Sequence, residues 1–426
     1  MSSTRYAGLL PPAGSTGSTL DHLEGSLTGA RFDADTLIGT DPADGRPLLA
    51  RYDLEQAART LTKYEIAMRR AGGLWRWSEI LPVRSWEFVT YLGEGSTPLV
   101  PARRLSVELG LQHVFMKAES LNPTGSFKAR GMAVAVSRAL ELGAAGLVAP
   151  SAGNAAGSLA AYAAAAGLSA VVIMPSDAPS ANMTEVLISG GQLILMDGLI
   201  SDCGRLAKAI AQASHAFDLS TLKEPYRVEG KKTLGLELAE DFNWELPDVI
   251  VYPTGGGTGI VGMWKAFDEL ETMGLISSQR PRMVSVQAEG CAPIVRAFQA
   301  GERFATPWVG ATTKAAGIRV PGAIGDFLIL DCIRASGGTA IAVAEQSILT
   351  TQSRIGALGA GFASLETSAA FAALPILVEI GAIKPHERIV VFDTGAGFKS
   401  EAPEMALPEA VGREDGDWKS LLDRIK

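Results

Sequence analysis

Residues 121–132, with the sequence LNPTGSFKARGM, place a polar turn directly before a helix-forming run. Pro123 and Gly125 end the preceding apolar segment, and Ser126 is suited to cap a helix that begins directly after it. Lys128 then falls in the first turn of that helix, where the helix dipole disfavours a cation. Most lysines near a helix start are solvated surface residues. A lysine that acts as a nucleophile must be partly uncharged, however, and a helix start beside apolar neighbours lowers its pKa.

Around this stretch, short apolar segments alternate with longer helical ones. The expected strands lie at residues 114–117, 146–149, 170–174, 192–196, 249–252, 282–286, 339–343 and 389–392. The expected helices lie near residues 127–142, 154–166, 180–190, 201–214, 230–243, 258–274, 345–356 and 365–381. Strands that are buried on both faces and alternate with helices predict parallel sheets joined by right-handed crossovers. We therefore predict an α/β fold with two parallel-sheet, three-layer domains and a short N-terminal extension.

The expected domain boundaries follow from this pattern. A large domain takes residues 51–135 and 226–410, a small mobile domain takes residues 136–225, and flexible tails take residues 1–20 and 411–426. Apolar residues at helical spacing predict a helix over residues 53–71. The segment 75–81 contains two tryptophans and is expected to dock on the main body, and residues 93–99 form a tight loop that leads into a short strand.

Residues 21–50 carry two pairs of carboxylates, each pair three positions apart, at Asp21 and Glu24 and at Asp41 and Asp44. Cysteines at these positions would give the spacing of a zinc ribbon, so we interpret the segment as a degenerate, zinc-ribbon-like one without cysteine ligands. Four carboxylates suit a hard cation such as calcium, whereas two separated acidic pairs are more often a solvated surface. We predict no resident metal, and the sequence leaves open whether this segment holds any ion.

Composition excludes several classes of protein. The 426 residues include 38 Lys and Arg against 46 Asp and Glu, a net charge of −8, without a basic run, which argues against a nucleic-acid partner. The longest run of small apolar residues, 155–170, is interrupted by polar residues and too weakly hydrophobic to span a membrane. The three widely spaced cysteines fit a reducing compartment. We predict a cytoplasmic protein with a small-molecule ligand.

Ligands of parallel α/β sheets bind beyond the carboxyl ends of the strands, so the loops after the expected strands are the places for functional residues. The first unusual loop, residues 151–157, has the sequence SAGNAAG and opens an alanine-rich helix. Backbone N–H groups at a helix start suit an anion such as a carboxylate, and the Asn154 amide can donate to a phenolate or carbonyl oxygen. Taken alone, this loop is better explained by a plain Ser/Asn helix cap.

The second loop, residues 253–259, has the sequence PTGGGTG. Consecutive glycines expose backbone N–H groups before another helix, which is the composition of a phosphate cradle. No Lys-Ser or Lys-Thr pair follows at P-loop spacing, and the glycines do not match a dinucleotide-binding motif in register. A flexible turn is the alternative, but the position between a strand and a helix favours a binding function.

Two further segments complete the candidate site. Thr394 follows the strand expected at 389–392, where its hydroxyl can face a bound ring or bond its own backbone. Residues 223–233 contain four cations, which usually indicates a solvated face. Arg227 lies at the entry to a helix, however, where it can bind a second phosphate bidentately.

Together these loops resemble the fold-type II pyridoxal-phosphate enzymes, the tryptophan synthase β family. The run 122–128, NPTGSFK, resembles the cofactor-lysine motif, and the other three loops resemble that family's asparagine, phosphate and pyridine-nitrogen segments. The likeness spans residues 75–400. Within the family, the segments 73–77, 93–99, 226–233 and 316–320 are most similar to threonine synthases.

The resemblance implies a homodimeric lyase that binds pyridoxal 5'-phosphate in the cleft between the two domains. Lys128 would bond the cofactor covalently and shuttle protons, Asn154 would hold its ring oxygen, and Thr394 would face its pyridine nitrogen. Its phosphate would be bound by Gly255, Gly256, Gly257 and Thr258. The substrate's α-carboxylate would be bound by Ser151, Gly153 and Ala155, and its phosphate by Arg227 with Ser220 or Thr221.

The implied reaction converts O-phospho-L-homoserine and water to L-threonine and phosphate, as a step of amino-acid biosynthesis. One departure concerns the substrate: threonine synthases commonly carry aspartate after the cofactor lysine, whereas Ala129 stands here, as in relatives that deaminate hydroxy amino acids. A threonine or serine dehydratase is therefore the alternative. A nicotinamide-dependent dehydrogenase and a non-catalytic relative that keeps the cofactor pocket are further hypotheses.

Overall fold

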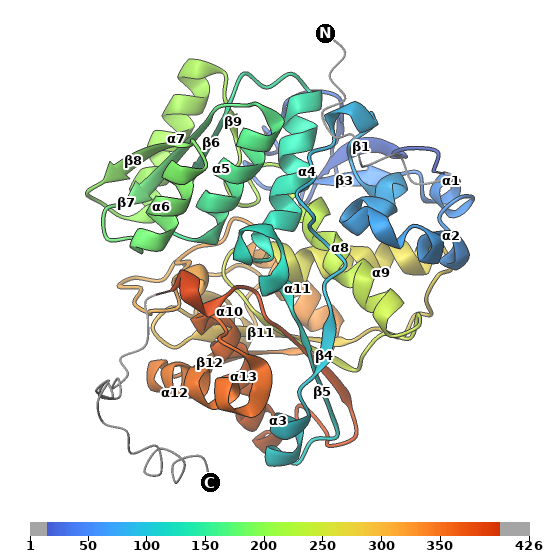
Figure 1. The fold of residues 1–426 in the computed structure, drawn as a ribbon, viewed down its shortest axis with the longest axis vertical. Helices are drawn as coiled ribbons and strands as arrows, with labels where there is room; N and C mark the ends of the chain where they lie inside the picture. The colour runs from blue at the N-terminus through green and yellow to red at the C-terminus, as the bar shows by residue number, and fades with distance from the viewer. Residues whose placement is uncertain (1–14, 401–426) are drawn as a thin grey trace, which may run out of the picture.

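The structure of the protein, a computed structural model, describes residues 15–400. The tail predicted at 411–426 lies outside the described residues, as do most of the tail predicted at 1–20 and the last residues assigned to the large domain. The described chain contains two parallel sheets and one small antiparallel sheet (Figure 1). The predicted α/β fold with parallel sheets is confirmed.

The larger sheet has six strands in the order β12-β11-β10-β13-β5-β4, and only the edge strand β4 is antiparallel to its neighbour. Its strands are β4 (Leu99–Pro101), β5 (His113–Lys117), β10 (Val249–Pro253), β11 (Arg282–Ala288), β12 (Thr339–Val343) and β13 (Arg388–Phe392). Alternate residues of β10 join different cores. Ile250 and Tyr252 belong to the core that includes α8 (Tyr226–Asp241) and α9 (Thr258–Thr272), whereas Val249 and Val251 belong to that of α13 (Leu365–Glu379). Helices therefore cover both faces, as three layers require.

The smaller sheet has four parallel strands in the order β8-β7-β6-β9. They are β6 (Leu147–Pro150), β7 (Ala170–Pro175), β8 (Gln192–Met196) and β9 (Phe217–Asp218). The helices that connect them are α5 (Asn154–Ala166), α6 (Ser180–Ile188) and α7 (Ile200–Ser214). All of these elements lie within residues 136–225. That these residues form a separate mobile domain stays a prediction.

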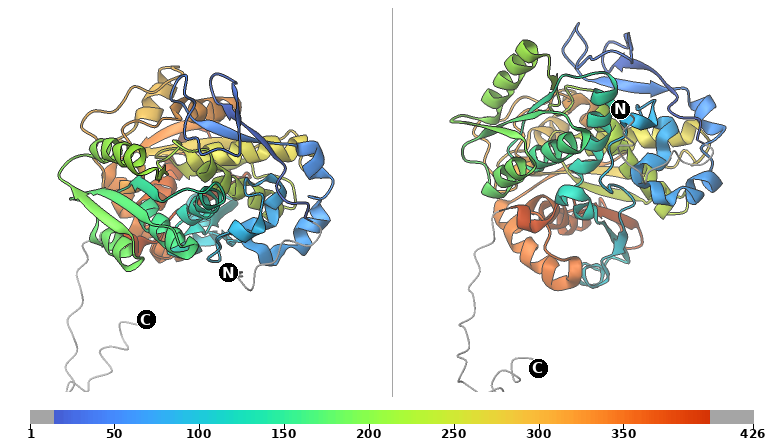
Figure 2. Two further views of the ribbon diagram at one scale, coloured as in Figure 1. Left: turned by 90° about the horizontal axis from the view of Figure 1, so that it is seen from above. Right: turned by 45° about the horizontal axis from the view of Figure 1, so that its top comes forward.

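The N-terminal segment forms an antiparallel sheet of β1 (Leu20–Gly25), β2 (Arg31–Asp33) and β3 (Leu48–Tyr52), in the order β2-β1-β3. Figures 1 and 2 show this segment and the four-stranded sheet on opposite sides of α4 (Lys128–Glu141). The sequence analysis did not predict these strands, because the segment is too rich in turn residues to show a strand pattern.

The four carboxylates of the predicted degenerate ribbon each have a protein partner. Asp21 pairs with Arg31 at 2.8 Å, Glu24 pairs with Arg51 at 2.6 Å, and Asp41 accepts a hydrogen bond from Thr28 at 2.5 Å. Asp44 accepts one from the backbone N–H of Arg46 at 2.8 Å. Within residues 15–400, no three His, Cys, Asp or Glu side chains are placed to hold a metal ion together. The four carboxylates thus belong to the local structure of the small sheet.

The single helix predicted over residues 53–71 is wrong. The chain forms two short helices, α1 (Leu54–Ala58) and α2 (Lys63–Met68), each with its own cap: Asp53 accepts the N–H of Gln56 and Thr62 accepts that of Glu65. Two capping side chains nine residues apart thus divide the segment. A 3₁₀ segment, η1 (Arg70–Ile80), follows. Its Trp75 and Trp77 are fully buried, as expected for a docking segment.

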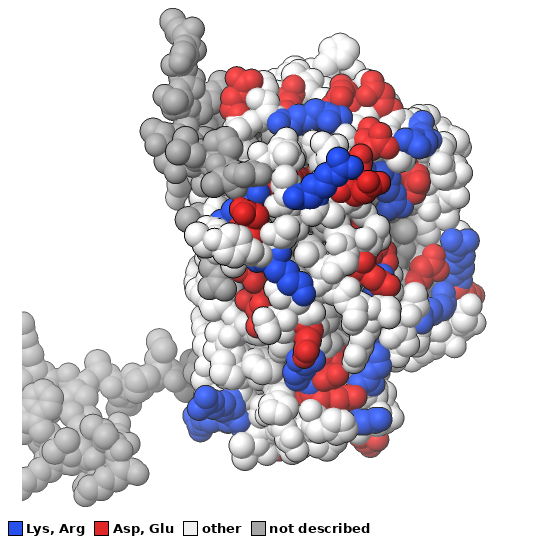
Figure 3. All heavy atoms as spheres, turned by 90° about the vertical axis from the view of Figure 1, so that its right-hand side faces the viewer, with Lys and Arg blue, Asp and Glu red and all other residues white. Residues whose placement is uncertain are grey.

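Helix α12 (Glu345–Ile355) follows β12 as predicted, whereas the shorter helices α3 (Arg103–Glu108), α10 (Pro293–Gln299) and α11 (Asp326–Ala335) were not predicted. Residue 226 begins α8, four positions before the start predicted at 230. No helix in the described part of the chain is long and apolar enough to cross a membrane. On the face in Figure 3, basic and acidic side chains are interspersed rather than gathered by sign.

Helix α8 packs against α4 through glycines. A Cβ at Gly230 would lie 2.0 Å from the backbone oxygen of Arg130, and one at Gly131 would lie 2.9 Å from that of Arg227. Only glycines allow so close a crossing. It brings the charged first turns of α8 against the first turn of α4, which begins at Lys128.

Candidate active site

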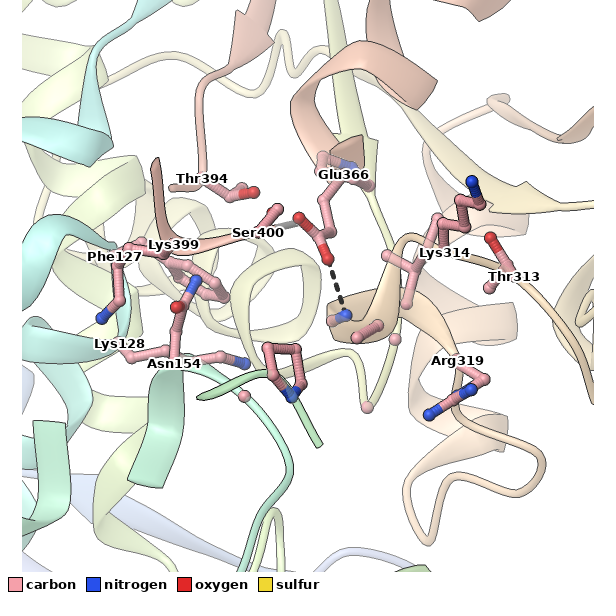
Figure 4. A pocket seen from close by; sticks show the side chains of 18 of the residues that line it. Phe127, Lys128, Asn154, Thr313, Lys314, Arg319, Glu366, Thr394, Lys399 and Ser400 are labelled. Atoms are coloured by element: carbon pink, nitrogen blue, oxygen red, sulfur yellow. Dashed lines mark hydrogen bonds between the residues drawn. The ribbon is translucent and has the colours of Figure 1, made fainter. Parts of the chain in front are cut away.

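A pocket of about 560 Å³ lies at the carboxyl ends of both parallel sheets. Its walls come from segments that follow β5, β6, β7 and β9–β13, the place where parallel α/β sheets bind ligands. Figure 4 shows two groups of side chains on opposite sides of it, Lys128 and Asn154 against Thr313, Lys314 and Arg319, with Thr394 and Glu366 between them.

Lys128 is the first residue of α4, and its partly buried side chain lines the pocket. The Nζ lies 4.5 Å from the centroid of the Phe127 ring and forms no ion pair with a carboxylate of residues 15–400. Burial, and to a lesser extent the positive charge of Arg227, lowers the pKa of Lys128 to about 7, against an opposing effect of Glu366. The expected lowering is present, but burial is its main cause. Much of the amine is therefore uncharged near neutral pH, as a nucleophile requires.

The turn before Lys128 is bonded to the loop after β13. The N–H of Phe127 donates to the backbone oxygen of Thr394 at 3.1 Å. The cap predicted at Ser126 is wrong: Phe127 is the N-cap of α4, and no side chain caps it. The Ser126 hydroxyl instead accepts the N–H of Lys128 at 3.4 Å, at a position too early in the helix for a cap.

Asn154 is the first residue of α5, and its side chain lines the pocket near Gly395. A Cβ at Gly395 would lie 2.9 Å from the Asn154 Nδ2, so a larger residue there would displace the amide. Gly153 also lines the pocket, whereas Ser151 and Ala155 are not among its lining residues. The hydroxyl of Ser151 bonds the backbone of Gly153 at 3.3 Å instead.

The glycine loop forms a wall of the pocket at the N-terminus of α9, and Gly255, Gly256, Gly257 and Thr258 all line it. Gly257 has a φ of +83°, which favours glycine. A Cβ at Gly255 would lie 2.4 Å from the backbone oxygen of Gly317, and one at Gly256 would lie 2.6 Å from Thr221. The glycines thus leave space and backbone N–H groups that side chains would remove.

Thr394 is buried and lines the pocket behind β13. Its backbone N–H donates to the hydroxyl of Thr367 at 3.1 Å, and that hydroxyl donates to Asp393 at 3.0 Å. Burial raises the pKa of Asp393 to about 6. The backbone of Thr394 is therefore fixed by neighbours outside the pocket.

The candidate residues for a second phosphate lie in two places. Thr221 lines the pocket, whereas Ser220 and Arg227 do not. The Ser220 hydroxyl donates to Asp218 at 2.5 Å. Arg227 is buried in the first turn of α8, where its Nη1 donates to the backbone oxygen of Leu219 at 2.7 Å, and its buried Nη2 has no hydrogen-bond partner among the described residues.

Several pocket residues were not predicted from the sequence. Glu366 accepts the N–H of Gly317 at 2.6 Å, the bond drawn in Figure 4. Lys314 and Arg319 supply two cations from the segment after α10, and the similarity at 316–320 was a signal for Arg319. Lys399 donates to the carboxylate of Glu185 in α6 at 2.7 Å. Glu366 and Lys314 have no local pattern that would have marked them.

This arrangement fits pyridoxal phosphate. A partly uncharged lysine, a side-chain amide and a neutral hydroxyl share one pocket with a glycine loop at a helix N-terminus, where the backbone N–H groups suit a phosphate. The pocket thus holds separate places for a carbonyl-reactive amine, for an aromatic ring and for an anion.

Comparison with known proteins gives the same class. The chain matches the family of pyridoxal-phosphate dependent enzymes over residues 90–395, and it belongs to that family. It is therefore an enzyme that depends on pyridoxal phosphate, as the sequence predicted.

More particular similarities follow. The chain is 34% identical to the threonine synthase of Methanocaldococcus jannaschii over 380 residues, which cover 89% of this chain and 92% of that one. It is 34% identical to the threonine synthase of Methanosarcina acetivorans over 405 residues, 95% and 98% of the two chains. A solved structure of threonine deaminase isoform 2 from Solanum lycopersicum superposes with a TM-score of 0.61 at 22% identity, covering 70% of this chain and 79% of that one.

Proposed function

We propose that the protein is a threonine synthase, a lyase that converts O-phospho-L-homoserine and water to L-threonine and phosphate. Relatives of that name cover almost the whole chain. The observation that carries the proposal is Arg227. Arg227 does not line the pocket itself, but it is buried close enough to Lys128 to lower the pKa of that amine, and one of its terminal nitrogens has no partner among the described residues. A site for an amino acid alone needs no such second anion position.

The alanine after the cofactor lysine does not favour a dehydratase. Ala129 is fully buried in α4 and is not among the pocket-lining residues, so its identity does not determine what touches a substrate. Membership of the pyridoxal-phosphate family also removes the nicotinamide-dependent dehydrogenase from consideration.

In this proposal the cofactor is held by side chains and backbone that already line the pocket. Lys128 would bond it covalently, the Asn154 amide would donate to its ring oxygen, and Thr394 would face its ring nitrogen with a neutral hydroxyl. The N–H groups of the loop after β10 would bind its phosphate, from Gly255, Gly256, Gly257 and Thr258. The bound cofactor supplies an acceptor for the electrons released when a proton leaves the substrate.

The chain's own residues would then move protons and hold the substrate. With a pKa of about 7, the Lys128 amine can take a proton from Cα and return protons later. Phosphate would leave Cγ with the C–O bonding electrons beside Thr221, which lines the pocket, and the positive charge of the buried Arg227 would stabilise it. Water then supplies a hydroxyl group to Cβ, and Cγ ends as a methyl group. The backbone N–H groups at the start of α5, from Gly153 onward, would bind the substrate carboxylate.

A substrate panel tests the reaction. The purified full chain, saturated with pyridoxal phosphate, should release phosphate from O-phosphohomoserine far faster than it releases ammonia from threonine or serine. The opposite ranking would identify a dehydratase. No turnover of any of the three would favour the non-catalytic relative.

Substitution of Arg227 and chemical labelling of Lys128 test the roles of these two residues. Arg227→Ala should lower kcat/KM for O-phosphohomoserine at least 100-fold and lower any threonine deamination much less, because threonine carries no phosphate and loses only the effect of Arg227 on the Lys128 amine. Arg319→Ala, on the opposite side of the pocket, is the matched control. For Lys128, borohydride reduction should fix the cofactor on the peptide that contains this residue, and labelling elsewhere would contradict its role.

We further propose a cytoplasmic homodimer, as the resemblance implies. Sedimentation equilibrium of the purified protein should give twice the chain mass, and a concentration-independent monomer would refute the dimer. Fractionation of the source cells should place the enzyme with the cytoplasmic markers.

A further inference from the structure

Lys231, in the second turn of α8, is a fully buried lysine without a carboxylate partner among the described residues. Its Nζ donates a hydrogen bond to the backbone oxygen of Phe127, immediately before Lys128. The same Nζ lies 4.5 Å from the centroid of the Phe127 ring, which is also the distance of the Lys128 Nζ. Both amines therefore lie against one aromatic side chain that lines the pocket.

The helix crossing explains this position. The glycine contact between α4 and α8 brings the two backbones together, and a Cβ at Gly131 would lie 3.0 Å from the Lys231 Nζ. Arg227 precedes Lys231 by one helical turn, so both side chains project from the same face of α8 toward the start of α4. Two like charges at this spacing repel each other, and burial strengthens the repulsion.

The next residue, Lys232, is also a buried lysine, but it has carboxylate partners. Its Nζ lies 2.7 Å from Glu229 and 2.8 Å from Glu269, so two carboxylates balance its charge. Lys231 has no equivalent. Of the charged groups that affect the pKa of Lys231 most, Lys128, Arg227 and Arg130 are positive and Glu119 is negative. Glu119 already pairs with Arg130 at 2.6 Å.

We propose that Lys231 is a positioning residue that, together with Arg227, completes a subsite for the dianionic phosphate group of a phosphate-monoester substrate, and that it takes up a proton when this anion binds. The proposal rests on the proposed function for the identity of the substrate. It adds a residue that touches neither the pocket surface nor the reacting atoms.

The charges on both helices explain the proton uptake. Burial, and then the positive charges of Lys128 and Arg227, lowers the pKa of Lys231 well below its usual value, which favours the uncharged amine when no anion is present. A dianion beside Arg227 reverses the sign of the local field and favours the protonated amine. The neutral amine is a tolerable buried group because it donates to Phe127, and the charged form becomes tolerable only with the anion in place.

Calorimetry on the full chain saturated with pyridoxal phosphate tests this coupling. Sulfate is the probe, because it carries two negative charges and does not itself titrate near pH 8. Titrations in buffers of low and high ionisation enthalpy give the number of protons taken up per sulfate bound. We expect close to one for the wild type. Absence of sulfate binding at tens of millimolar, or binding without proton uptake, would overturn the proposal.

Variants test whether the proton taken up with sulfate binds to Lys231. Lys231→Met should lose the uptake and bind sulfate about ten-fold more weakly, whereas Lys231→Arg, with its fixed charge, should bind sulfate without uptake. Arg227→Gln should weaken binding at least ten-fold, and Lys314→Gln, across the pocket, should keep the uptake. If both Lys231 variants keep it, Lys231 has only a structural role. If either variant fails to fold, the other and the wild-type buffer dependence decide.

The outcome is separable from that of the substrate panel. Proton uptake that depends on Lys231 in an enzyme that does not turn over O-phosphohomoserine would retain the subsite and refute the proposed reaction. Turnover of O-phosphohomoserine without such proton uptake would support the proposed reaction and refute the role of Lys231.

Discussion

Replacing Tyr162 by phenylalanine should destabilise the protein more at high pH than at low pH. The Tyr162 hydroxyl, on α5, donates to the Glu94 carboxylate at 2.6 Å. Trp75 Nε1 donates to the same carboxylate at 3.1 Å, and the backbone N–H of Leu92 also donates to it at 2.9 Å. Glu94 is fully buried and has no cationic partner among the described residues. Burial raises the pKa of Glu94 to about 7, and the three hydrogen bonds oppose the rise.

The direction of the pH effect follows from the coupling between proton binding at Glu94 and folding. Because the folded state raises the pKa of Glu94 from 4.5 to about 7, its contribution to stability is complete below pH 4.5 and is lost as the pH rises through 7. The loss across this window is about 3 kcal/mol, at about 1.4 kcal/mol for each pKa unit. The hydrogen bond from Tyr162 is worth about 1 kcal/mol to the neutral acid and about 2–3 kcal/mol to the carboxylate. Tyr162→Phe should therefore lower the free energy of unfolding by about 1 kcal/mol at pH 5.5 and by about 1–2 kcal/mol more at pH 8.5.

Urea unfolding followed by tryptophan fluorescence at both pH values measures the difference. The control is Tyr226→Phe, because that hydroxyl donates to the backbone oxygen of Ala34 at 3.3 Å, an acceptor that does not titrate. Tyr226→Phe should lower the free energy of unfolding by the same amount at both pH values. An equal cost for Tyr162→Phe at pH 5.5 and 8.5 would refute the assignment of an ionising partner.

Two further predictions concern the packing of α8 and the link between the two parallel sheets. Gly230→Ala should cost more than about 3 kcal/mol or prevent folding, because its Cβ would lie 2.0 Å from the backbone oxygen of Arg130. The matched Gly204→Ala in α7, where a Cβ would meet nothing within 4 Å, should stabilise the protein by about 0.5–1 kcal/mol in the same thermal-unfolding assay. Lys399→Met should remove the ion pair with Glu185 and speed proteolysis between residues 176 and 190. A double-mutant cycle with Glu185→Gln should give a coupling of about 1 kcal/mol, and additive effects would show that the pair is not coupled.

The fold was largely predictable because the strands of the two parallel sheets are short apolar runs, and a central strand such as β10 is buried on both faces. Loops at both ends fix the limits of these runs, so even the more exposed edge strands β8 and β12 begin and end where the sequence predicts. The start of α8 was not predictable in the same way. Its first turns contain Arg227, Lys231 and Lys232, all buried, and a charged run resembles a solvated segment until its tertiary partners are known.

The same physical reason limits the prediction of the site. Lys128, Asn154 and Thr394 lie in motifs directly after strands, so sequence alone brings them together at the carboxyl ends of the sheets. Glu366 and Lys314 enter the pocket from segments without a motif, and only packing places them there. The cap predicted at Ser126 failed for a related reason: hydrogen bonds with the loop after β13, not a capping side chain, hold the start of α4.

The contacts between the two sheets have a consequence for closure of the site. The residues that link them are close neighbours of the catalytic turn: Thr124 shares a hydrogen bond of 2.7 Å with Ser158 of α5, and Lys399 donates to Thr124 at 2.6 Å and to Glu185 of α6 at 2.7 Å. If residues 136–225 move as predicted, we expect the movement to pull on the turn that precedes Lys128 through these bonds. Substrate binding at the start of α5 would act on that turn in the same way. We therefore propose that the geometry of the Lys128 amine changes with closure of the site and favours proton transfer only after the substrate is enclosed.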